Sequence, residues 1–219
     1  MRFPSEPHLF SKLATVSFPT LGHFLEDGFA NHHVRAIVPD VKVVGRAVTL
    51  RLTSPDAIAV NNALAQLKPG DVLVIDMNGD HEHAPIGAVT ACAAINAGAS
   101  AIIVDGAVTD LLELRQTRLP VFARGSSLLT TKKLGDDTSV FNGTVMCAGV
   151  QVRPGDIVLA DDNGILFSNA HTLAEVVDRA IASDLEEPAT LRRLNAEQRI
   201  SDVLQCSARA SIHGTNSQH

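Results

Sequence analysis

Two carboxylates near the middle of the chain, Asp105 and Asp110, follow a short apolar run at the positions where an α/β fold places functional side chains. Upstream of them, Gly87 stands where a helix of small residues would begin, so the first backbone amides of that helix would be unpaired. Open α/β folds bind ligands at such helix N-termini, whose free amides suit anionic groups. The stretch therefore predicts a crevice that both carboxylates and one helix N-terminus face.

Each of these features also has a structural interpretation. An Asp-Gly pair after a strand is ordinary turn chemistry, and Asp110 could cap a helix that starts at Leu111. His81 and His83 could hold a metal if they lie on a strand, where alternate residues share a face. In a polar loop they would be solvated instead, so spacing alone leaves these alternatives open.

The elements that must position these residues are typical of an α/β fold. Small residues over 88–97 predict a helix, with Pro85 suited to its first turn and Gly98 suited to a left-handed cap at its end. Residues 101–104 are all apolar, which predicts a strand buried on both faces. Open α/β folds bind ligands beyond the carboxyl ends of such strands.

The remaining pattern predicts further short elements. We expect strands over 41–52, 72–76, 120–125, 157–161 and 165–167, and a further strand over 139–152 that is interrupted by Gly143 and Gly149. We expect helices over 21–26 (with Thr20 as its N-cap), 57–67, 111–116 and 190–204, and a long helix that starts at Asn169 or Thr172 and reaches 185. Residues 126–137 read as a loop, and Pro188 is expected to divide the last two helices. The stretch 68–76 resembles 153–161, which predicts two similar turn-strand units.

Composition limits the class of protein. The chain has 219 residues, 45% of them hydrophobic, and a formal net charge of −6. We expect one domain over 1–206, with a core at about 41–168 and C-terminal helices over 170–205, followed by a disordered tail over 207–219. The acidic balance argues against nucleic acid and anionic membranes as partners, and no apolar run reaches the length of a membrane span.

The cysteines point to a reducing compartment. Cys92, Cys147 and Cys206 are odd in number and far apart, so they form neither a disulfide framework nor a Cys-x-x-Cys metal site. The N-terminus also lacks the apolar region of a signal peptide. A cytoplasmic location is the expectation that follows.

Three segments carry a resemblance to a known family. In order they are G-A-V-T-A-C-A-A-I-N-A-G-A-S-A-I-I-V-D-G-A-V-T-D, L-P-V-F-A-R-G and G-V-Q-V-R-P-G-D-I-V-L-A-D-D-N-G-I-L-F. With these segments, residues 41–167 resemble the RraA-like family, which includes class II 4-hydroxy-4-methyl-2-oxoglutarate aldolases and regulators of ribonuclease activity. The resemblance implies a three-layer β/β/α swivelling fold. It also implies a homo-oligomer, either a trimer or a dimer of trimers, with active sites between subunits.

The resemblance assigns roles to individual residues. The family's aldolases carry an Asp, twenty intervening residues and an Arg-Asp pair, and the last Asp binds a divalent metal. That Asp is Asp110 here, which implies a Mg²⁺ or Mn²⁺ ligand, whereas Ala88 replaces the first Asp and Thr109 replaces the Arg. The substrate carboxylate is implied to bind the amides at the helix start: Gly87, Ala88, Val89 and Thr90.

The two replacements weaken the implied site unequally. Helix amides bind a carboxylate whatever their side chains are, so Ala88 need not abolish that contact. Thr109 offers one neutral hydroxyl in place of a bidentate charge, and losing such a stabiliser costs about 2–4 kcal/mol at the transition state. Candidates to replace the charge are Arg124, Lys132 and Lys133. Candidates for a carboxylate that a neighbouring subunit contributes in the family are Glu186 and Glu187.

The function implied by the resemblance is that of a divalent-metal-dependent lyase acting on small 2-keto acids. It would cleave a 4-hydroxy-2-oxo acid to pyruvate by a retro-aldol reaction, decarboxylate oxaloacetate, or do both, with Asp110 and Thr109 as catalytic residues. Two alternatives stay open. One is a non-catalytic regulatory or binding protein of the same family, and the other is an enzyme whose substrate has changed because of Ala88 and Thr109.

Overall fold

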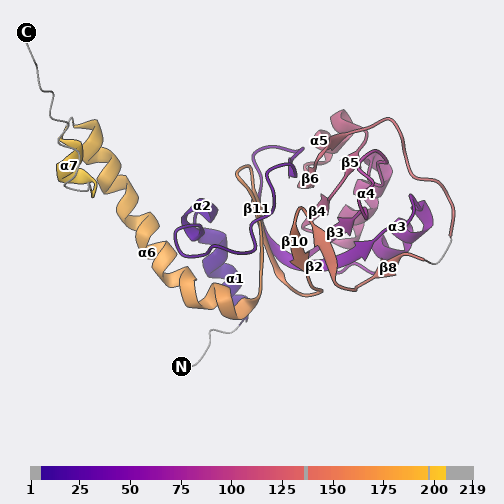
Figure 1. Cartoon of the computed structure of the whole chain (residues 1–219), viewed down its shortest axis with the longest axis horizontal. Coiled ribbons are helices and arrows are strands. Elements are labelled where there is room, and N and C mark those ends of the chain that lie inside the picture. The colour runs from indigo at the N-terminus through magenta and orange to yellow at the C-terminus, as the bar shows by residue number, and fades with distance from the viewer. Residues whose placement is uncertain (1–5, 136–137, 197, 206–219) are drawn as a thin grey trace, which may run out of the picture. The chain divides into compact units, whose positions relative to one another are not determined.

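A mixed sheet of eight strands forms the centre of the computed structural model, which describes residues 6–135, 138–196 and 198–205 (Figure 1). Its strands are β1 (Arg35–Ala36), β2 (Lys42–Arg51), β3 (Asp71–Asp76), β4 (Ala101–Val104), β6 (Val121–Ala123), β8 (Val140–Phe141), β11 (Ile157–Asp161) and β12 (Gly164–Ser168). The order is β1-β6-β4-β3-β2-β11-β12, and β8 pairs with β2. Strands β2, β3, β4 and β6 are parallel, and the outer strands are antiparallel to their neighbours.

The two ends of the sheet approach each other. Phe29, on the segment that leads into β1, forms a bridge with Leu166 of β12, and the Ala30 amide donates to the Ile165 carbonyl at 2.9 Å. Backbone polar groups on the outer side of β12 therefore find partners, which leaves less unpaired sheet edge.

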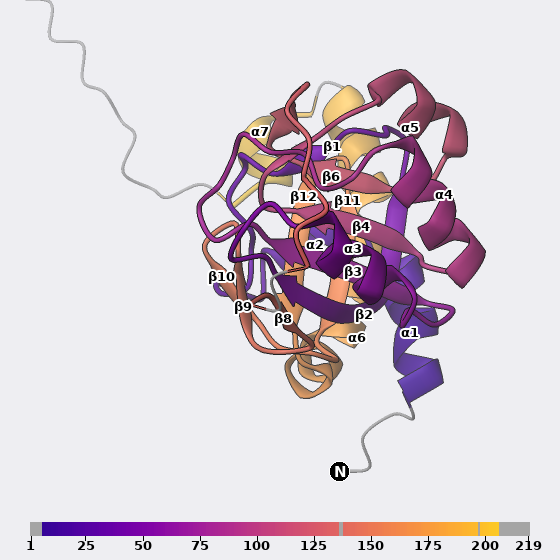
Figure 2. The same cartoon turned by 90° about the vertical axis from the view of Figure 1, so that its right-hand side faces the viewer.

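Helices cover one face of the sheet and a hairpin covers the other (Figure 2). The helices are α3 (Ala57–Leu64), α4 (Ala88–Ala97) and α5 (Leu111–Thr117), and the hairpin consists of β9 (Val145–Cys147) and β10 (Val150–Val152). Side chains alternate between the faces, so Leu73 and Ile75 join the helical core while Val72 and Val74 join the hairpin core. The chain is thus an α/β protein with the expected β/β/α layers.

The terminal helices form a third core against the antiparallel edge. They are α1 (Glu6–Thr15), α2 (Phe18–Leu21) and the first part of α6 (Ala170–Asn195), where Leu173, Val177 and Ala180 are buried at helical spacing. A short α7 (Ile200–Val203) follows. The chain forms two compact units, Met1–Ile181 and Ala182–His219, whose boundary falls within α6. None of the helices in the described part of the chain combines the length and apolar composition needed to cross a membrane.

Most of the predicted elements are confirmed, with shifts at their ends. The helix 88–97, its left-handed Gly98 cap (φ 83°) and the buried strand 101–104 occur as expected. The expected helix over 21–26 is wrong, because α2 spans Phe18–Leu21 with a proline in its first turn, where the fixed φ of proline favours helix initiation. The strand predicted over 139–152 is interrupted at Gly143 and Gly149 as expected, and its parts are β8, β9 and β10.

The prediction that Pro188 divides two helices is also wrong, because α6 continues through it to Asn195. A proline removes one helical N–H donor, but good helix formers such as Leu185, Glu186 and Ala189 flank it here. The predicted single domain over 1–206 stays a prediction. Cys206 and the tail 207–219 lie outside the described residues.

The two similar turn-strand units are confirmed in their hydrogen bonds. Asp71 accepts the Lys68 amide at 2.7 Å, and Asp156 accepts the Arg153 amide at 2.8 Å. At the other end of each strand, Asp76 and Asp161 each accept the amide two residues ahead, both at 2.8 Å. The two strands flank β2 on opposite sides, one parallel and one antiparallel to it.

A row of four charged residues marks the carboxyl edge of the parallel strands. Arg51 of β2 lies opposite Asp76 of β3 in the sheet register. The register of β3 with β4 and of β4 with β6, continued past the last paired residues, places Asp105 next to Asp76 and Arg124 next to Asp105. Four charged residues therefore lie side by side at this edge: Arg51, Asp76, Asp105 and Arg124. Arg51 Nε lies 2.9 Å from Asp76 Oδ2, and Arg124 Nε lies 2.6 Å from Asp105 Oδ1. Each central carboxylate thus has its own guanidinium, which offsets the repulsion between two neighbouring negative charges.

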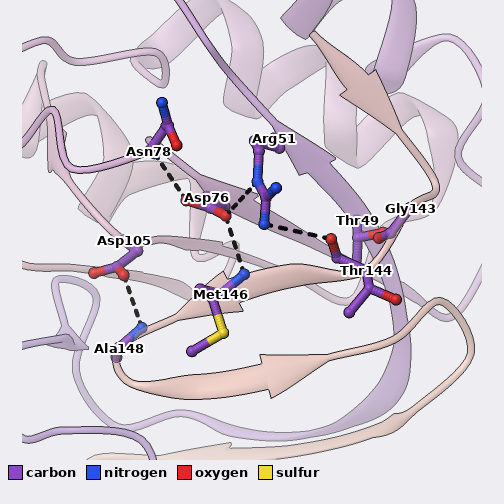
Figure 3. A network of polar contacts seen from close by, with 9 residues as sticks. All are labelled: Thr49, Arg51, Asp76, Asn78, Asp105, Gly143, Thr144, Met146 and Ala148. Carbon is purple, nitrogen blue, oxygen red and sulfur yellow. Dashed lines mark hydrogen bonds and ion pairs between the residues drawn. The ribbon is translucent and has the colours of Figure 1, made fainter.

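The same carboxylates hold the hairpin over the edge of the sheet. Figure 3 shows the Met146 amide donating to Asp76 (3.0 Å) and the Ala148 amide donating to Asp105 (2.8 Å). Arg51 also donates to the Thr144 carbonyl at 3.5 Å. The edge where open α/β sheets usually bind ligands is here closed by main chain.

We predict that this network stabilises the fold far more than a surface ion pair does. Asp76→Ala leaves Arg51 and the Met146 amide without their carboxylate, so we expect a loss of about 3 kcal/mol in the free energy of unfolding. Asp178→Ala is the control, because Asp178 pairs with Lys12 while its side chain is 69% exposed, and we expect a loss under about 1 kcal/mol. Urea unfolding of both variants measures the difference, and equal losses would contradict the prediction.

Candidate functional site

The start of α4 lies against the loop that leaves β5 (Ala107–Val108). The Thr109 amide donates to the Ile86 carbonyl at 2.9 Å, which brings Thr109 and Asp110 beside Gly87 and Ala88. On the far side of β5, the Ser127 amide donates to the Val108 carbonyl at 2.9 Å, next to β7 (Gly125–Ser126). The sequence-predicted residues 87–90 and 109–110 are therefore brought together by main-chain hydrogen bonds.

Asp110 binds the N-terminus of α4. The Ala88 amide donates to Asp110 Oδ2 at 2.9 Å, and Thr109 Oγ1 donates a long bond of 3.4 Å to Asp110 Oδ1. The residue is exposed, and its backbone is left-handed (φ 55°, ψ 47°), which Asp tolerates better than most residues do. Asp110 does stand at the N-cap position of α5, as the structural alternative expects, but its side chain makes no cap bond there and instead binds the neighbouring helix α4.

Gly87 permits this contact because it has no side chain. A Cβ built on Gly87 would lie 2.5 Å from Asp110 Oδ2 and 2.8 Å from Thr109 Cγ2. Its φ of −145° is ordinary extended backbone, so the requirement for glycine comes from close approach rather than from conformation. Any larger residue would move the carboxylate.

Only some of the predicted amides are open. Thr90 Oγ1 accepts the Gly87 amide at 2.8 Å, and the Ala88 amide is bound to Asp110. Within the residues that the structure describes, the Val89 and Thr90 amides have no acceptor. The helix N-terminus thus presents two adjacent amide donors beside one carboxylate.

Asp105 does not share this site, contrary to the expectation that both carboxylates face one crevice. Its two oxygens bind Arg124 and the Ala148 amide, in the charged row at the sheet edge. Cys147 lies between the two carboxylates of that row, and burial, followed by the charges of Asp105 and Asp76, raises the pKa of its thiol well above the usual value. Such surroundings disfavour the thiolate, which is the reactive form of cysteine.

The histidine pair lies in a loop. His83 Nδ1 is 2.7 Å from Asp80 Oδ2, and Asp80 Oδ1 accepts the amides of Glu82 and His83. Partial burial alone would raise the pKa of the Asp80 carboxyl, but these hydrogen bonds and His83 outweigh it and lower that pKa. In the described part of the chain, no three His, Cys, Asp or Glu side chains cluster in a way that could hold a metal ion.

Of the predicted substitutes for a missing positive charge, the Arg124 guanidinium is bound to Asp105, and the Lys132 backbone pairs with Pro55 and Ala57 at the start of α3. Replacement of the charge by Lys132 or Lys133 stays a prediction. Among the described residues Asp110 forms no ion pair. The bond between the Thr90 hydroxyl and the Gly87 amide was not predicted from the sequence. A signal for this bond exists in the sequence, because a polar side chain three residues after the residue that begins a helix can accept the backbone amide of that first residue.

Comparison with known proteins agrees with this fold. Residues 20–167 match the RraA-like family, described as Aldolase/RraA, and the chain belongs to that family. A relative from Halalkalibacterium halodurans, named "Putative 4-hydroxy-4-methyl-2-oxoglutarate aldolase", is 30% identical over 171 residues, which cover 77% of this chain and 80% of that protein.

Two solved structures share the architecture. Streptomyces coelicolor RraAS2, titled an unusual member of the RNase ES inhibitor RraA protein family, matches with a TM-score of 0.71 and 25% identity over 88% of this chain and 98% of that one. An uncharacterized protein from Pseudomonas syringae pv. tomato has a TM-score of 0.77 at 20% identity, covering 93% and 96% of the two chains, which shows the fold alone.

We predict that the bare Gly87 is required for the Asp110 contact. Gly87→Ala forces a Cβ against Asp110 and Thr109, so we expect a loss of about 2 kcal/mol in unfolding free energy and loss of the Ala88 amide hydrogen bond. Gly125→Ala is the matched control, since its added Cβ meets nothing within 4 Å, and its change should stay within about 0.5 kcal/mol. Chemical denaturation and the amide proton shift of Ala88 measure the two effects. An unshifted Ala88 resonance in Gly87→Ala would refute the argument.

Proposed function

We propose that the chain is a divalent-metal-dependent lyase that acts on small 2-keto acids, by retro-aldol cleavage of a 4-hydroxy-2-oxo acid to pyruvate, by oxaloacetate decarboxylation, or by both. The observation that carries this proposal is Asp110, an exposed carboxylate with one oxygen fixed on the Ala88 amide and the other bound only by a long contact. Membership of a family described as Aldolase/RraA supports the reaction class.

The donor set fits a hydrated hard cation. Mg²⁺ is bound in many proteins by one or two carboxylates and keeps several waters, so a single exposed Asp110 suffices as a protein ligand. The Ala88 amide would hold Asp110 in a fixed orientation, as outer hydrogen bonds do for many metal ligands. When bound, the cation would polarise the 2-keto carbonyl and stabilise the negative charge left by carbon–carbon cleavage.

The chain's own residues would hold the substrate beside Asp110. The open amides of Val89 and Thr90 suit the substrate carboxylate, and the Thr109 hydroxyl can donate one further hydrogen bond. Asp110 already places a negative charge at the helix N-terminus, and no arginine or lysine pairs with it among the described residues. An anionic substrate would be repelled there without a cation, so binding and catalysis should both depend on the metal.

Two other functions remain candidates. The similarity to RraAS2, titled a member of an RNase inhibitor family, favours a non-catalytic regulatory protein as the second candidate. Ala88 and Thr109 favour an enzyme with an altered oxoacid substrate, because they leave the pocket one carboxylate and one guanidinium short of the aldolase signature. We further propose a homo-oligomer in which Glu186 or Glu187 reaches the site of a neighbouring copy. The cytoplasmic location stays a prediction.

In the presence of Mg²⁺ or Mn²⁺, we expect the chain to release pyruvate from oxaloacetate or from 4-hydroxy-4-methyl-2-oxoglutarate. We expect pyruvate release to stop when a chelator is added. Asp110→Ala removes the proposed metal ligand, so we expect kcat/KM to fall about 100-fold or more. Asp178→Ala, on α6, is the carboxylate control and should retain full activity. A coupled pyruvate assay on both substrates makes the measurement.

Either of two results would count against the lyase. Absence of turnover with both substrates would remove these two reactions, and the candidates left would be the enzyme with an altered oxoacid substrate and the regulatory protein. Turnover that persists in chelator or in Asp110→Ala would show that the metal or its ligand is wrongly assigned.

A further inference from the structure

Thr90 is the side chain that fixes the first turn of α4. Its Oγ1 accepts the Gly87 amide at 2.8 Å and donates to the Gly87 carbonyl at 3.0 Å. The same carbonyl accepts the Ala91 amide at 2.9 Å, the first bond of the helix. One hydroxyl therefore binds both main-chain polar groups of the residue on which the helix begins.

Gly87 is also the residue against which Asp110 packs. Its Cα approaches so closely that a Cβ would stand 2.5 Å from Asp110 Oδ2, and the next amide in the chain, that of Ala88, donates to the same oxygen. A rotation of the peptide that joins Gly87 and Ala88 would change both contacts at once. The bonds from Thr90 oppose that rotation.

The Thr90 hydroxyl also decides which amides remain open. It binds the Gly87 amide, Asp110 binds the Ala88 amide, and the next two amides have no acceptor among the described residues. Without the hydroxyl, the Gly87 amide would be a third open donor, and an anion could bind one residue earlier, away from its place beside Asp110.

We propose that Thr90 is a positioning residue of the candidate active site. By holding Gly87, its hydroxyl keeps the Ala88 amide on Asp110 and leaves the Val89 and Thr90 amides as the pair that receives the substrate carboxylate. The inference rests on the proposed lyase function. The Thr90 side chain contacts main chain and no reacting atom, so it would act on the site through Gly87.

A purely structural hydroxyl would behave differently, and the chain offers a matched control. Thr117, at the opposite end of α5 from Asp110, donates to the Leu114 carbonyl at 2.7 Å and accepts the Leu119 amide at 3.3 Å. It is likewise a threonine with two main-chain bonds at a helix end. Thr117→Val should lower Tm while leaving metal and substrate affinity unchanged.

The test compares Thr90→Val, Thr90→Ala, Thr90→Ser and Thr117→Val with the unaltered chain. We measure the Kd for Mn²⁺ by titration, kcat and KM for oxaloacetate, and Tm. Because changes to groups that orient a metal ligand typically cost 10–100-fold in affinity or activity, Thr90→Val and Thr90→Ala should each raise the Mn²⁺ Kd about tenfold. Both variants should raise KM more than they lower kcat. Thr90→Ser keeps the hydroxyl, so its Mn²⁺ Kd, KM and kcat should each stay within about twofold of the values for the unaltered chain.

The outcomes separate this inference from the proposed function. If the unaltered chain is active and Thr90→Val and Thr90→Ala bind Mn²⁺ and substrate as it does, the positioning role is overturned and the lyase stands. The same holds if Thr90→Ser is as impaired as Thr90→Val, or if Thr117→Val is equally impaired. If the unaltered chain neither binds Mn²⁺ nor turns over oxoacid, both proposals fall. Thr90→Val replaces the hydroxyl with a second methyl group, which could hinder folding. Thr90→Ala removes the hydroxyl and adds no methyl group, so it still gives the result if Thr90→Val fails to fold.

Discussion

The hydrogen bond from the Ala88 amide to Asp110 Oδ2 is the interaction on which the arrangement of the site depends. It joins the N-terminus of one helix to the residue that precedes the next, and it requires a glycine at position 87, because a Cβ there would overlap the carboxylate. A left-handed backbone at Asp110 accompanies it, a conformation that costs energy for most side chains and is often kept where function requires it. The carboxylate thus binds the positive end of a helix dipole while one of its faces stays exposed.

The carboxyl edge of the parallel sheet explains why the site lies where it does. In open α/β folds this edge is the usual place for ligands. Here Arg51, Asp76, Asp105 and Arg124 form a row of paired charges. Figure 3 shows that the Met146 and Ala148 amides bind the two carboxylates of this row, so the edge is occupied by the protein itself. The start of α4, which the loop after β5 contacts through the Thr109 amide, stays accessible at Val89.

Metal dependence would resolve an electrostatic conflict within the site. Two open amides suit a carboxylate, yet Asp110 beside them carries a negative charge and has no cationic partner among the described residues. A divalent cation on Asp110 makes the two features compatible, because it changes the sign of the local charge. In the proposed function, Thr109 would then contribute a neutral hydroxyl, which would give direction rather than charge to substrate binding.

The sequence by itself determined the strand and the helix beside which the candidate site lies. The all-apolar run 101–104 required a strand buried on both faces, and the small residues from Ala88 to Gly98 required a slim helix with a left-handed end, since these signals are local. The tertiary structure decided which partner each polar group has. Asp105 and Asp110 look alike in the sequence, but register places Arg124 beside the first, and close approach places the Ala88 amide beside the second. Such pairings join residues that are far apart in the chain, so no local sequence pattern specifies them. They form only when the strands pair in register and the helices pack against the sheet.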